Sequence, residues 1–333
     1  MLTRRTAILS LSAAVTSLAT GSGLSLAESS FDGQTITYIV ATKAGGGYDT
    51  MARLVAKYLE KYLEGTGVRV KNVSGGGHVV GALEIFNAAP DGLTIGTFNS
   101  GLLYAQFLGQ LKPPLDLHRF EWIGKAAVET RLLVSGADTP FYTLDDLRQV
   151  GRPIRCAASG VRSASYFDTV ILARALDFAV KIIPGFEGKE GELSLMRGEV
   201  DCIVGSGSAL LPFVRNGFGR AIVQVGGGTG STIPEAKNFA RTNDAKSLID
   251  LIGFQAQLSR LTAAPPGTNP LRLAALRKAY MEALSDPKFL EEASMLDLPI
   301  APMDGKHVAA AVKQALNPKL ELIAEIKKLL PSE

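Results

Sequence analysis

The stretch Thr35-Ile-Thr-Tyr-Ile-Val-Ala-Thr-Lys-Ala-Gly-Gly-Gly-Tyr-Asp-Thr-Met-Ala-Arg53 decides the fold of this chain. Its first part is β-branched and apolar, its centre is three glycines, and its end opens an amphipathic run, so it predicts a strand, a tight loop and a helix. The glycines let a ligand approach the backbone closely. We expect Asp49 to cap the helix, whose free N–H groups favour an anion. The alternative is a plain βα turn in which Asp49 is only a cap.

Two more units of the same kind follow along the chain. Residues 68–73 predict a strand before a glycine loop at 74–78, and residues 93–98 predict a strand before a polar loop at 99–101. The carboxyl ends of parallel strands meet at one edge of a sheet, which is where open α/β sheets bind ligands. These loops are therefore expected to face a ligand together.

The alternation of strand and helix patterns stops near residue 120. An extended apolar stretch at 120–135 follows and predicts a crossover into a second domain. Strand and helix patterns then restart, with a strand expected at 154–158 and a helix at 164–176, and residues Thr143–Asp146 match a capping box. A second extended stretch at 252–263 predicts a return crossover, and the chain is then helical to residue 330. We therefore expect an α/β protein of two domains, each a mostly parallel sheet flanked by helices, joined by two crossover strands. The expected ranges are 31–128 with 254–333 for domain 1, and 129–253 for domain 2.

The N-terminus predicts export from the cytoplasm. Residues 1–27 have a basic start at Arg4 and Arg5, a moderately apolar run, and small residues before a cleavage site near Ala27. The Thr-Arg-Arg-Thr context is similar to a twin-arginine signal, and the general export route is the alternative. Cleavage removes two of the 35 basic residues and none of the 32 acidic ones, so the mature chain has a formal net charge of +1. We expect a periplasmic, monomeric protein of about 306 residues that does not bind nucleic acid.

The motifs of several enzyme classes are absent from the sequence. No Gly-x-Ser-x-Gly pentapeptide occurs, and the three histidines His78, His118 and His307 belong to no zinc motif. The run Gly75-Gly-Gly77 lacks the third glycine of a dinucleotide fingerprint, because Val80 stands in its place. We therefore expect no catalytic residues, no metal and no cofactor. Cys156 and Cys202 both lie in strand-like runs, and the sequence leaves open whether they form a disulfide.

The order of short motifs along residues 31–333 resembles the substrate-binding proteins of tripartite tricarboxylate transporters, also called Bug receptors. The resemblance rests on the Gly-Gly-Gly-x-Asp segment ending at Asp49, the second glycine loop, the segment Ala88-Ala-Pro-Asp-Gly-Leu-Thr94, the loop Pro184–Gly188, the segment Met196–Asp201 and the segment Ala264–Thr268. It implies a periplasmic receptor with the two-domain, type II-like binding-protein fold. Such a receptor binds a small organic acid in the cleft and delivers it to membrane permease subunits.

The resemblance also implies where the ligand is held, largely by backbone groups and water near the first glycine loop and the facing loop of the second domain. Carried over by position and combined with the loops above, the expected ligand-binding residues are Lys43, Ala44, Gly45, Gly46, Gly47, Tyr48, Asp49, Gly76, His78, Asn99, Ser100, Ser159, Gly160, Arg162, Ser163, Tyr166, Phe186 and Ser206. Lys43, Tyr48, Arg162 and Phe186 depart from the family pattern, which leaves the identity of the acid open.

Two hypotheses about the ligand follow from these departures. Tyr48, Tyr166 and Phe186 could stack on a flat apolar body, or they could belong to the domain cores. Lys43 and Arg162 could face each other across the cleft, and we expect one of them to contact the ligand carboxylate while backbone N–H groups at the helix starts do the rest. A sensor for a membrane signalling protein needs the same cleft, so the sequence leaves transport and sensing open.

Overall fold

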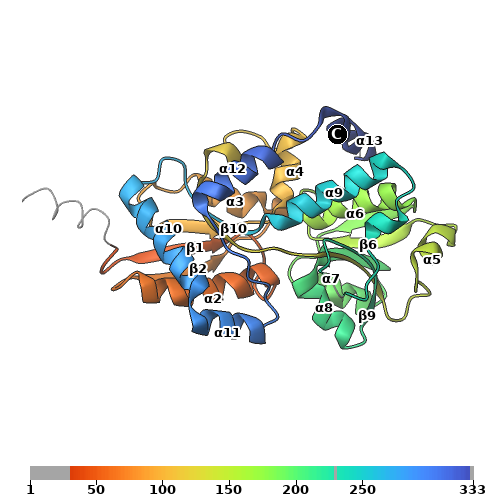
Figure 1. Ribbon diagram of the computed structural model, residues 1–333, viewed down its shortest axis with the longest axis horizontal. Coiled ribbons are helices and arrows are strands. Elements are labelled where there is room, and N and C mark those ends of the chain that lie inside the picture. The colour runs from red at the N-terminus through yellow and green to blue at the C-terminus, as the bar shows by residue number, and fades with distance from the viewer. Residues whose placement is uncertain (1–30, 229–230, 331–333) are drawn as a thin grey trace, which may run out of the picture.

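The computed structural model describes residues 31–228 and 231–330, which form two lobes side by side (Figure 1). A six-stranded sheet in the order β11-β4-β10-β3-β1-β2 forms the first lobe, and a five-stranded sheet in the order β7-β6-β8-β5-β9 forms the second. Apolar cores lie on both faces of each sheet. This confirms the expected two-domain α/β architecture. The export signal of residues 1–27 lies outside the described residues.

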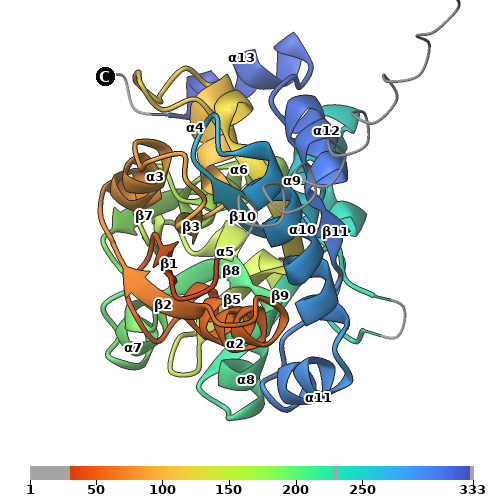
Figure 2. The same cartoon turned by 90° about the vertical axis from the view of Figure 1, so that its left-hand side faces the viewer.

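The first sheet gathers the expected ligand loops at one edge. Strand β1 (Thr35–Val40) pairs in parallel with β2 (Gly67–Asn72) and β3 (Thr94–Thr97). The other strands of the sheet, β4 (Glu121–Ala127), β10 (Ser259–Ala264) and β11 (Met303–Asp304), join it through antiparallel pairs. The sheet is thus more mixed than expected, because β10, which arrives from the other lobe, runs antiparallel to both β3 and β4, and β11 runs antiparallel to β4. Figure 2 shows this sheet from the side of the first lobe.

The alternation of side chains along β1 explains the layers of the first lobe. Ile36, Tyr38 and Val40 pack on the face covered by α2 (Gly47–Tyr62), α10 (Pro270–Ser285) and α11 (Pro287–Met295). Ile39 points to the other face, where α3 (Val79–Phe86), α4 (Gly101–Phe107) and α12 (Gly305–Ala315) pack. Successive residues of a strand point to opposite faces of the sheet. Because β1 is buried on both faces, most of its sequence is apolar.

The second lobe repeats this plan around its own mixed sheet. Its strands are β5 (Arg131–Gly136), β6 (Ile154–Ala158), β7 (Val180–Pro184), β8 (Cys202–Ser206) and β9 (Gly219–Val225). Its helices are α5 (Leu144–Gln149), α6 (Ala164–Leu176), α7 (Glu190–Met196), α8 (Gly207–Arg215) and α9 (Asn243–Gln257), and short 3₁₀ turns occur at Gly76–His78, Leu117–Arg119 and Ala236–Phe239. The expected capping box at Thr143 is present at the start of α5, which confirms that prediction.

Two crossovers connect the lobes. The first runs from β4 into β5, as the extended stretch at 120–135 predicted. The second joins α9 to β10, and here the prediction was wrong for residues 252–257, which are helical. The Thr242 hydroxyl accepts a hydrogen bond from the N–H of Ala245, and Leu248, Ile249 and Ile252 join the core against α6, so tertiary packing holds the helix to Gln257. Within the described residues no helix has the length and apolarity needed to cross a membrane.

The C-terminal helix returns to the second lobe. Helix α13 (Leu320–Leu329) packs against α6, Ile326 is buried in the second-lobe core, and Glu325 pairs with Arg174 at 3.0 Å. Figure 1 shows α13 beside the helices of that lobe, although the sequence grouped residues 254–333 with the first domain. The chain therefore passes between the lobes a third time, after α12.

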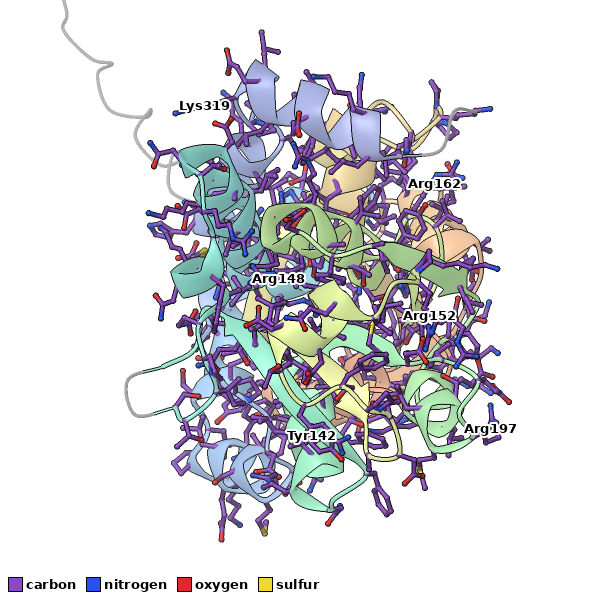
Figure 3. All side chains as sticks on the ribbon, turned by 90° about the vertical axis from the view of Figure 1, so that its right-hand side faces the viewer. Tyr142, Arg148, Arg152, Arg162, Arg197 and Lys319 are labelled. Carbon is purple, nitrogen blue, oxygen red and sulfur yellow. A yellow bond between two sulfur atoms is a disulfide. The ribbon has the colours of Figure 1, made fainter. Side chains whose placement is uncertain are left out.

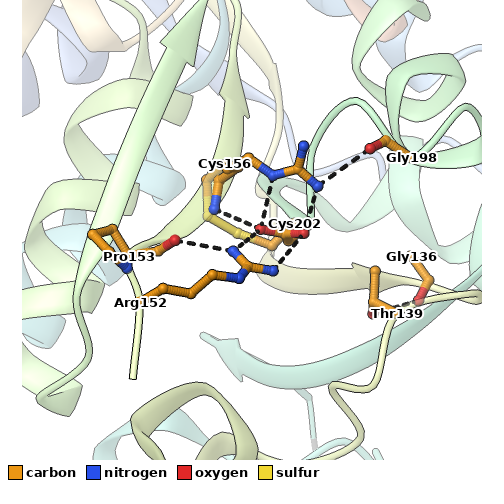
Figure 4. Close-up of polar contacts among 9 residues, drawn as sticks. Gly136, Thr139, Arg152, Pro153, Cys156, Gly198 and Cys202 are labelled. Atoms are coloured by element: carbon orange, nitrogen blue, oxygen red, sulfur yellow. Dashed lines mark hydrogen bonds and ion pairs between the residues drawn. A yellow bond between two sulfur atoms is a disulfide. The ribbon is translucent and has the colours of Figure 1, made fainter. Parts of the chain in front are cut away.

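A disulfide links Cys156 and Cys202, which resolves the question that the sequence left open. The two residues face each other on the parallel neighbours β6 and β8, with their Cα atoms 4.6 Å apart. Figure 4 shows the polar cluster beside it, where the Asp201 carboxylate accepts hydrogen bonds from Arg152 and Arg155. Burial opposes ionisation there, but these bonds hold the pKa of Asp201 well below its ordinary value.

Candidate functional site

A cavity of about 110 Å³ lies between the lobes. The first lobe contributes the loops after β1, β2 and β3, and the second lobe contributes loops after its own strands. The C-terminal end of α9 and the two crossovers complete the lining. The lining residues are Thr42, Gly46, Gly47, Tyr48, His78, Asn99, Ser100, Tyr104, Glu129, Arg131, Ser159, Ala164, Ser165, Asp168, Phe186, Gly188, Glu192, Ile203, Val204, Gly205, Ser206, Ala209, Leu210, Gln255, Ala256, Ser259 and Arg260. Its volume exceeds the ~30 Å³ of one liquid water several times, so it has room for a small organic molecule.

The backbones of the two lobes meet closely beside this cavity. A Cβ atom on Gly46 would lie 3.1 Å from the Cα of Gly188, and one on Gly160 would lie 2.8 Å from the Cα of Gly77. A Cβ at Gly160 would clash and one at Gly46 would be crowded, so glycine at both positions permits this approach. The Asn99 Oδ1 also accepts from Ala164 N across the lobes at 2.8 Å. The structure therefore shows the lobes in a closed arrangement.

The first glycine loop is held by Asp49, although not as its helix cap. Helix α2 begins earlier than expected, after Gly46, which leaves Asp49 inside the first turn. Its carboxylate accepts from Gly45 N at 2.9 Å, from Arg53 Nε at 3.0 Å and from Asn72 Nδ2 at 2.9 Å. Burial opposes ionisation, but these bonds lower the pKa of Asp49. Asp49 thus fixes the loop in its shape and has its own acceptors occupied.

A buried ion pair forms one wall of the cavity. Arg131 Nε donates to the Asp168 carboxylate at 2.6 Å, and the Tyr104 hydroxyl donates to the other oxygen at 3.0 Å. Burial raises the pKa of Asp168, and the charge of Arg131 works against that rise. Within the described residues, no hydrogen bond engages the two terminal nitrogens of Arg131. Asp168 therefore fixes the orientation of Arg131 through Nε, and the two terminal nitrogens of the guanidinium remain available to a ligand.

A second buried pair lies where the crossovers meet. Arg260 Nη2 donates to Glu129 at 2.8 Å and to the Ser208 hydroxyl at 3.3 Å, and its guanidinium lies 4.2 Å from the ring centroid of Tyr48. Its backbone is left-handed, with φ of 57°. A Cβ on Gly47 would lie 2.7 Å from Nη2, so the glycine makes room for this cation. Arg260 Nε is buried and has no partner within the described residues.

Two neutral side chains of the lining also have buried atoms without partners. His78 Nδ1 lies 2.8 Å from the carbonyl oxygen of Ala41, while Nε2 has no partner in the described residues. Burial lowers the pKa of His78 to about 4, so the ring is neutral near pH 7. Both amide atoms of Gln255, which is 2 % exposed, are likewise unpaired there. Buried polar atoms normally have partners, so these groups mark a place for a polar ligand or water.

Comparison with known proteins assigns the family. The family model described as "Tripartite tricarboxylate transporter family receptor" matches residues 51–328. The chain belongs to this receptor family. Its proteins are periplasmic solute-binding receptors and not enzymes, which confirms the resemblance seen in the sequence.

The relatives of this receptor are distant in sequence and close in fold. Protein BugT of Bordetella pertussis is 25 % identical over 263 residues, covering 77 % of this chain and 78 % of BugT. The structure of the periplasmic binding protein BugD is 21 % identical with a TM-score of 0.73, covering 89 % and 97 % of the two chains. MatC from Rhodopseudomonas palustris, solved with bound malate, is 22 % identical with a TM-score of 0.70, covering 89 % and 98 %.

The receptor brings half of the expected ligand-binding residues to the cavity. The expected residues in its lining are Gly46, Gly47, Tyr48, His78, Asn99, Ser100, Ser159, Phe186 and Ser206. Those outside the lining are Lys43, Ala44, Gly45, Asp49, Gly76, Gly160, Arg162, Ser163 and Tyr166. Three of these residues still hold the loops beside the cavity in shape. Gly45 N donates to Asp49, Gly160 N donates to the Ser163 hydroxyl, and that hydroxyl caps α6.

The two expected cations do not face each other across the cavity. Lys43 Nζ pairs with Glu190 of the second lobe at 2.9 Å, and each side chain is a little under half exposed. Arg162 lies at the edge of the molecule in Figure 3, and its Nε donates to the carbonyl oxygen of Gln110 at 3.2 Å. The N-terminus of α6 is not free either, because Asn99 accepts from Ala164 N. These contacts give the two cations and the helix start partners within the protein.

The two buried arginines were missed by the sequence reasoning. Arg131 and Arg260 stand inside apolar crossover segments that were read only as extended connections. A charged residue within an apolar run is seldom buried unless it is paired. An arginine inside each apolar crossover was therefore a signal in the sequence that could have pointed to these two residues. Tyr166, by contrast, packs edge-on against Phe167 in the second-lobe core, which leaves Tyr48 and Phe186 as the aromatic residues of the lining. No cluster in the described part of the chain is arranged to hold a metal ion.

Proposed function

We propose that this receptor captures a small organic carboxylate in the cavity between its lobes and delivers it to the membrane subunits of a tripartite tricarboxylate-type transporter. The observation that carries the proposal is Arg131, a buried cation of the cavity lining that is held by Asp168 and whose terminal nitrogens have no hydrogen-bond partner within the described residues. The guanidinium fork matches a carboxylate, and burial strengthens such a bond. MatC, which shares the fold, was solved with malate, and this supports the same ligand class.

Closure of the lobes completes the site in this proposal. The lining comes from both lobes, so the ligand contacts both sets of loops only when they are closed. The glycine contacts and the Lys43–Glu190 pair across the lobes belong to this closed arrangement. The two crossovers supply the hinge, as is common for domain closure around a ligand. A monomer suffices, because the whole lining belongs to one chain.

We also propose that residues 1–27 direct export and are removed near Ala27. Intact-mass measurement of the protein recovered from periplasmic extract tests this, with a mature chain starting near Glu28 as the expected result. Retention of the full-length mass in the cytoplasmic fraction would refute it.

A thermal-shift panel tests the carboxylate. A ligand that binds only the folded state stabilises it by RT ln(1 + [L]/Kd), which is about 2.7 kcal/mol at a hundredfold excess over Kd. We expect a mono-, di- or tricarboxylate to raise the unfolding midpoint, and the amide of the same acid, which lacks the charge, to raise it far less. A shift caused only by sugars, or an equal shift from acid and amide, would contradict the proposal.

A further inference from the structure

The charges around the cavity limit how much negative charge a ligand can bring. The charged side chains of the lining are Arg131 and Arg260 against Glu129, Asp168 and Glu192, and Lys189 pairs with Glu192 at 3.1 Å from outside the lining. The cavity is therefore close to neutral before a ligand enters. One carboxylate can be held by the Arg131 fork and nearby N–H donors. A second buried carboxylate would add a further negative charge, and the other cation of the lining, Arg260, already pairs with Glu129 and lies over Tyr48, so this charge would be poorly compensated and costly to bury.

His78 specifies a different group on the ligand. A carbonyl oxygen only accepts, so Nδ1 must carry the proton that it shares with Ala41 O, and the neutral ring then presents a lone pair at Nε2. His78 is 2 % exposed and Nε2 has no partner in the described part of the chain. Such a buried acceptor needs a donor, and a carboxylate has none. A ligand that carries an O–H or N–H group in addition to its acid would supply this donor directly.

A hydroxyl fits this requirement better than an ammonium group. The acidic side chains of the lining that could pair with an ammonium already have Arg131, Arg260 or Lys189 as partners. A hydroxyl brings no charge that must be desolvated, and it can also accept from the free amide of Gln255.

We propose that the ligand is a small hydroxymonocarboxylate, whose carboxylate binds Arg131 and whose hydroxyl donates to His78 Nε2. This inference rests on the proposed function and names the ligand within that site. It also separates this receptor from a binding site for dicarboxylates, because the second acidic group would add negative charge to a cavity whose other cation, Arg260, already pairs with Glu129.

Titration calorimetry on matched ligands tests the inference. The probes are lactate, propionate and 2-fluoropropionate, where fluorine fills the place of the hydroxyl but donates no hydrogen bond, and malate and alanine as the dicarboxylate and the amino acid. We expect lactate to bind roughly ten- to a hundredfold more tightly than propionate or 2-fluoropropionate, because the deoxy acids leave Nε2 unpaired. We expect malate and alanine to bind more weakly than lactate.

The variant His78→Asn separates a contact from a structural role. Asparagine tolerates the left-handed backbone at this position, where φ is 80°, and is too short to place an acceptor where Nε2 lies. We expect this variant to weaken lactate binding until it equals propionate binding, while the Kd for propionate changes less than about threefold, because propionate does not use Nε2. An equal loss for both acids would overturn the assignment of His78. The ligand comparison on the unaltered protein stands even if the variant fails to fold.

Each outcome bears on a different claim. Equal affinity for lactate and 2-fluoropropionate, or tighter binding of malate or alanine, would overturn the hydroxymonocarboxylate and leave carboxylate capture intact. Binding of none of these acids, nor of any carboxylate in the thermal-shift panel, would overturn the proposed function and this inference with it.

Discussion

The ion pair between Glu129 and Arg260 joins the two crossovers, and we expect it to be the most sensitive stability contact of the cleft. The side chains are 2 % and 4 % exposed, and the Glu129 N–H also bonds to Ala256 O at 3.2 Å. Arg260→Met keeps the length of the apolar stem but leaves a carboxylate buried with only Ser208 beside it. Removing one partner of a buried pair costs about 3–5 kcal/mol. The lost stacking on Tyr48 adds about 0.5–2 kcal/mol.

A double-mutant cycle separates the coupling energy of the Glu129–Arg260 pair from the other effects of each substitution on stability. We expect Glu129→Gln and Arg260→Met each to lower the free energy of unfolding by several kcal/mol, and the double variant to lose much less than their sum, since it buries no unpaired charge. Urea unfolding gives these free energies if the m-value stays constant. Two single variants that each cost under about 1 kcal/mol, with a strictly additive double variant, would refute the buried pair as a coupled unit.

Three further predictions follow from the cleft. Burial lowers the pKa of His78 to about 4 in the folded protein, whereas the unfolded chain takes up this proton below about pH 6.5. The free energy of unfolding is therefore unaffected by His78 above pH 6.5 and falls by about 3 kcal/mol as the pH drops to 4. In urea unfolding, the variant His78→Asn should lack this loss of stability. Gly160→Ala places a methyl group against Gly77 and should weaken ligand affinity in calorimetry with little change in the unfolding midpoint, whereas unchanged affinity would show that the lobes need not approach so closely. Arg162→Ala removes a bond to a backbone oxygen outside the lining, so we expect a change in Kd below about threefold, and a larger loss would restore Arg162 to the site.

Local pattern was enough to predict the βα units. The strand at 154–158 and the helix at 164–176 have the expected bounds, because an apolar pattern specifies each of them and the Ser163 hydroxyl caps the helix. The glycine loops were also placed correctly at the cleft, since the carboxyl ends of neighbouring parallel strands share one edge. These features depend on residues close together in the chain.

The partners of the buried charges could not be predicted in the same way. Arg260 meets Glu129 across 131 positions of sequence, and Arg131 meets Asp168 across 37. Nothing in the local pattern tells which acid will face which arginine, so the sequence analysis favoured the loop cations Lys43 and Arg162 instead. The return of α13 to the second lobe has the same cause, because Ile326 finds its core contact on an element more than a hundred residues earlier.

The most direct test of the account is a calorimetric comparison of ligand affinity between two charge-altering changes. One is Arg131→Gln combined with Asp168→Asn, which keeps the buried charge balanced and has Asp168→Asn alone as its control; the other is Lys43→Ala, which removes an exposed pair. A hydrogen bond to a charged group contributes about 1.5–3 kcal/mol, so we predict that the double change weakens the tightest-binding acid at least roughly tenfold relative to its control. We predict less than about a threefold change for Lys43→Ala, and that change should shrink in high salt. Full affinity in the double variant, with collapse of binding in Lys43→Ala, would contradict the account.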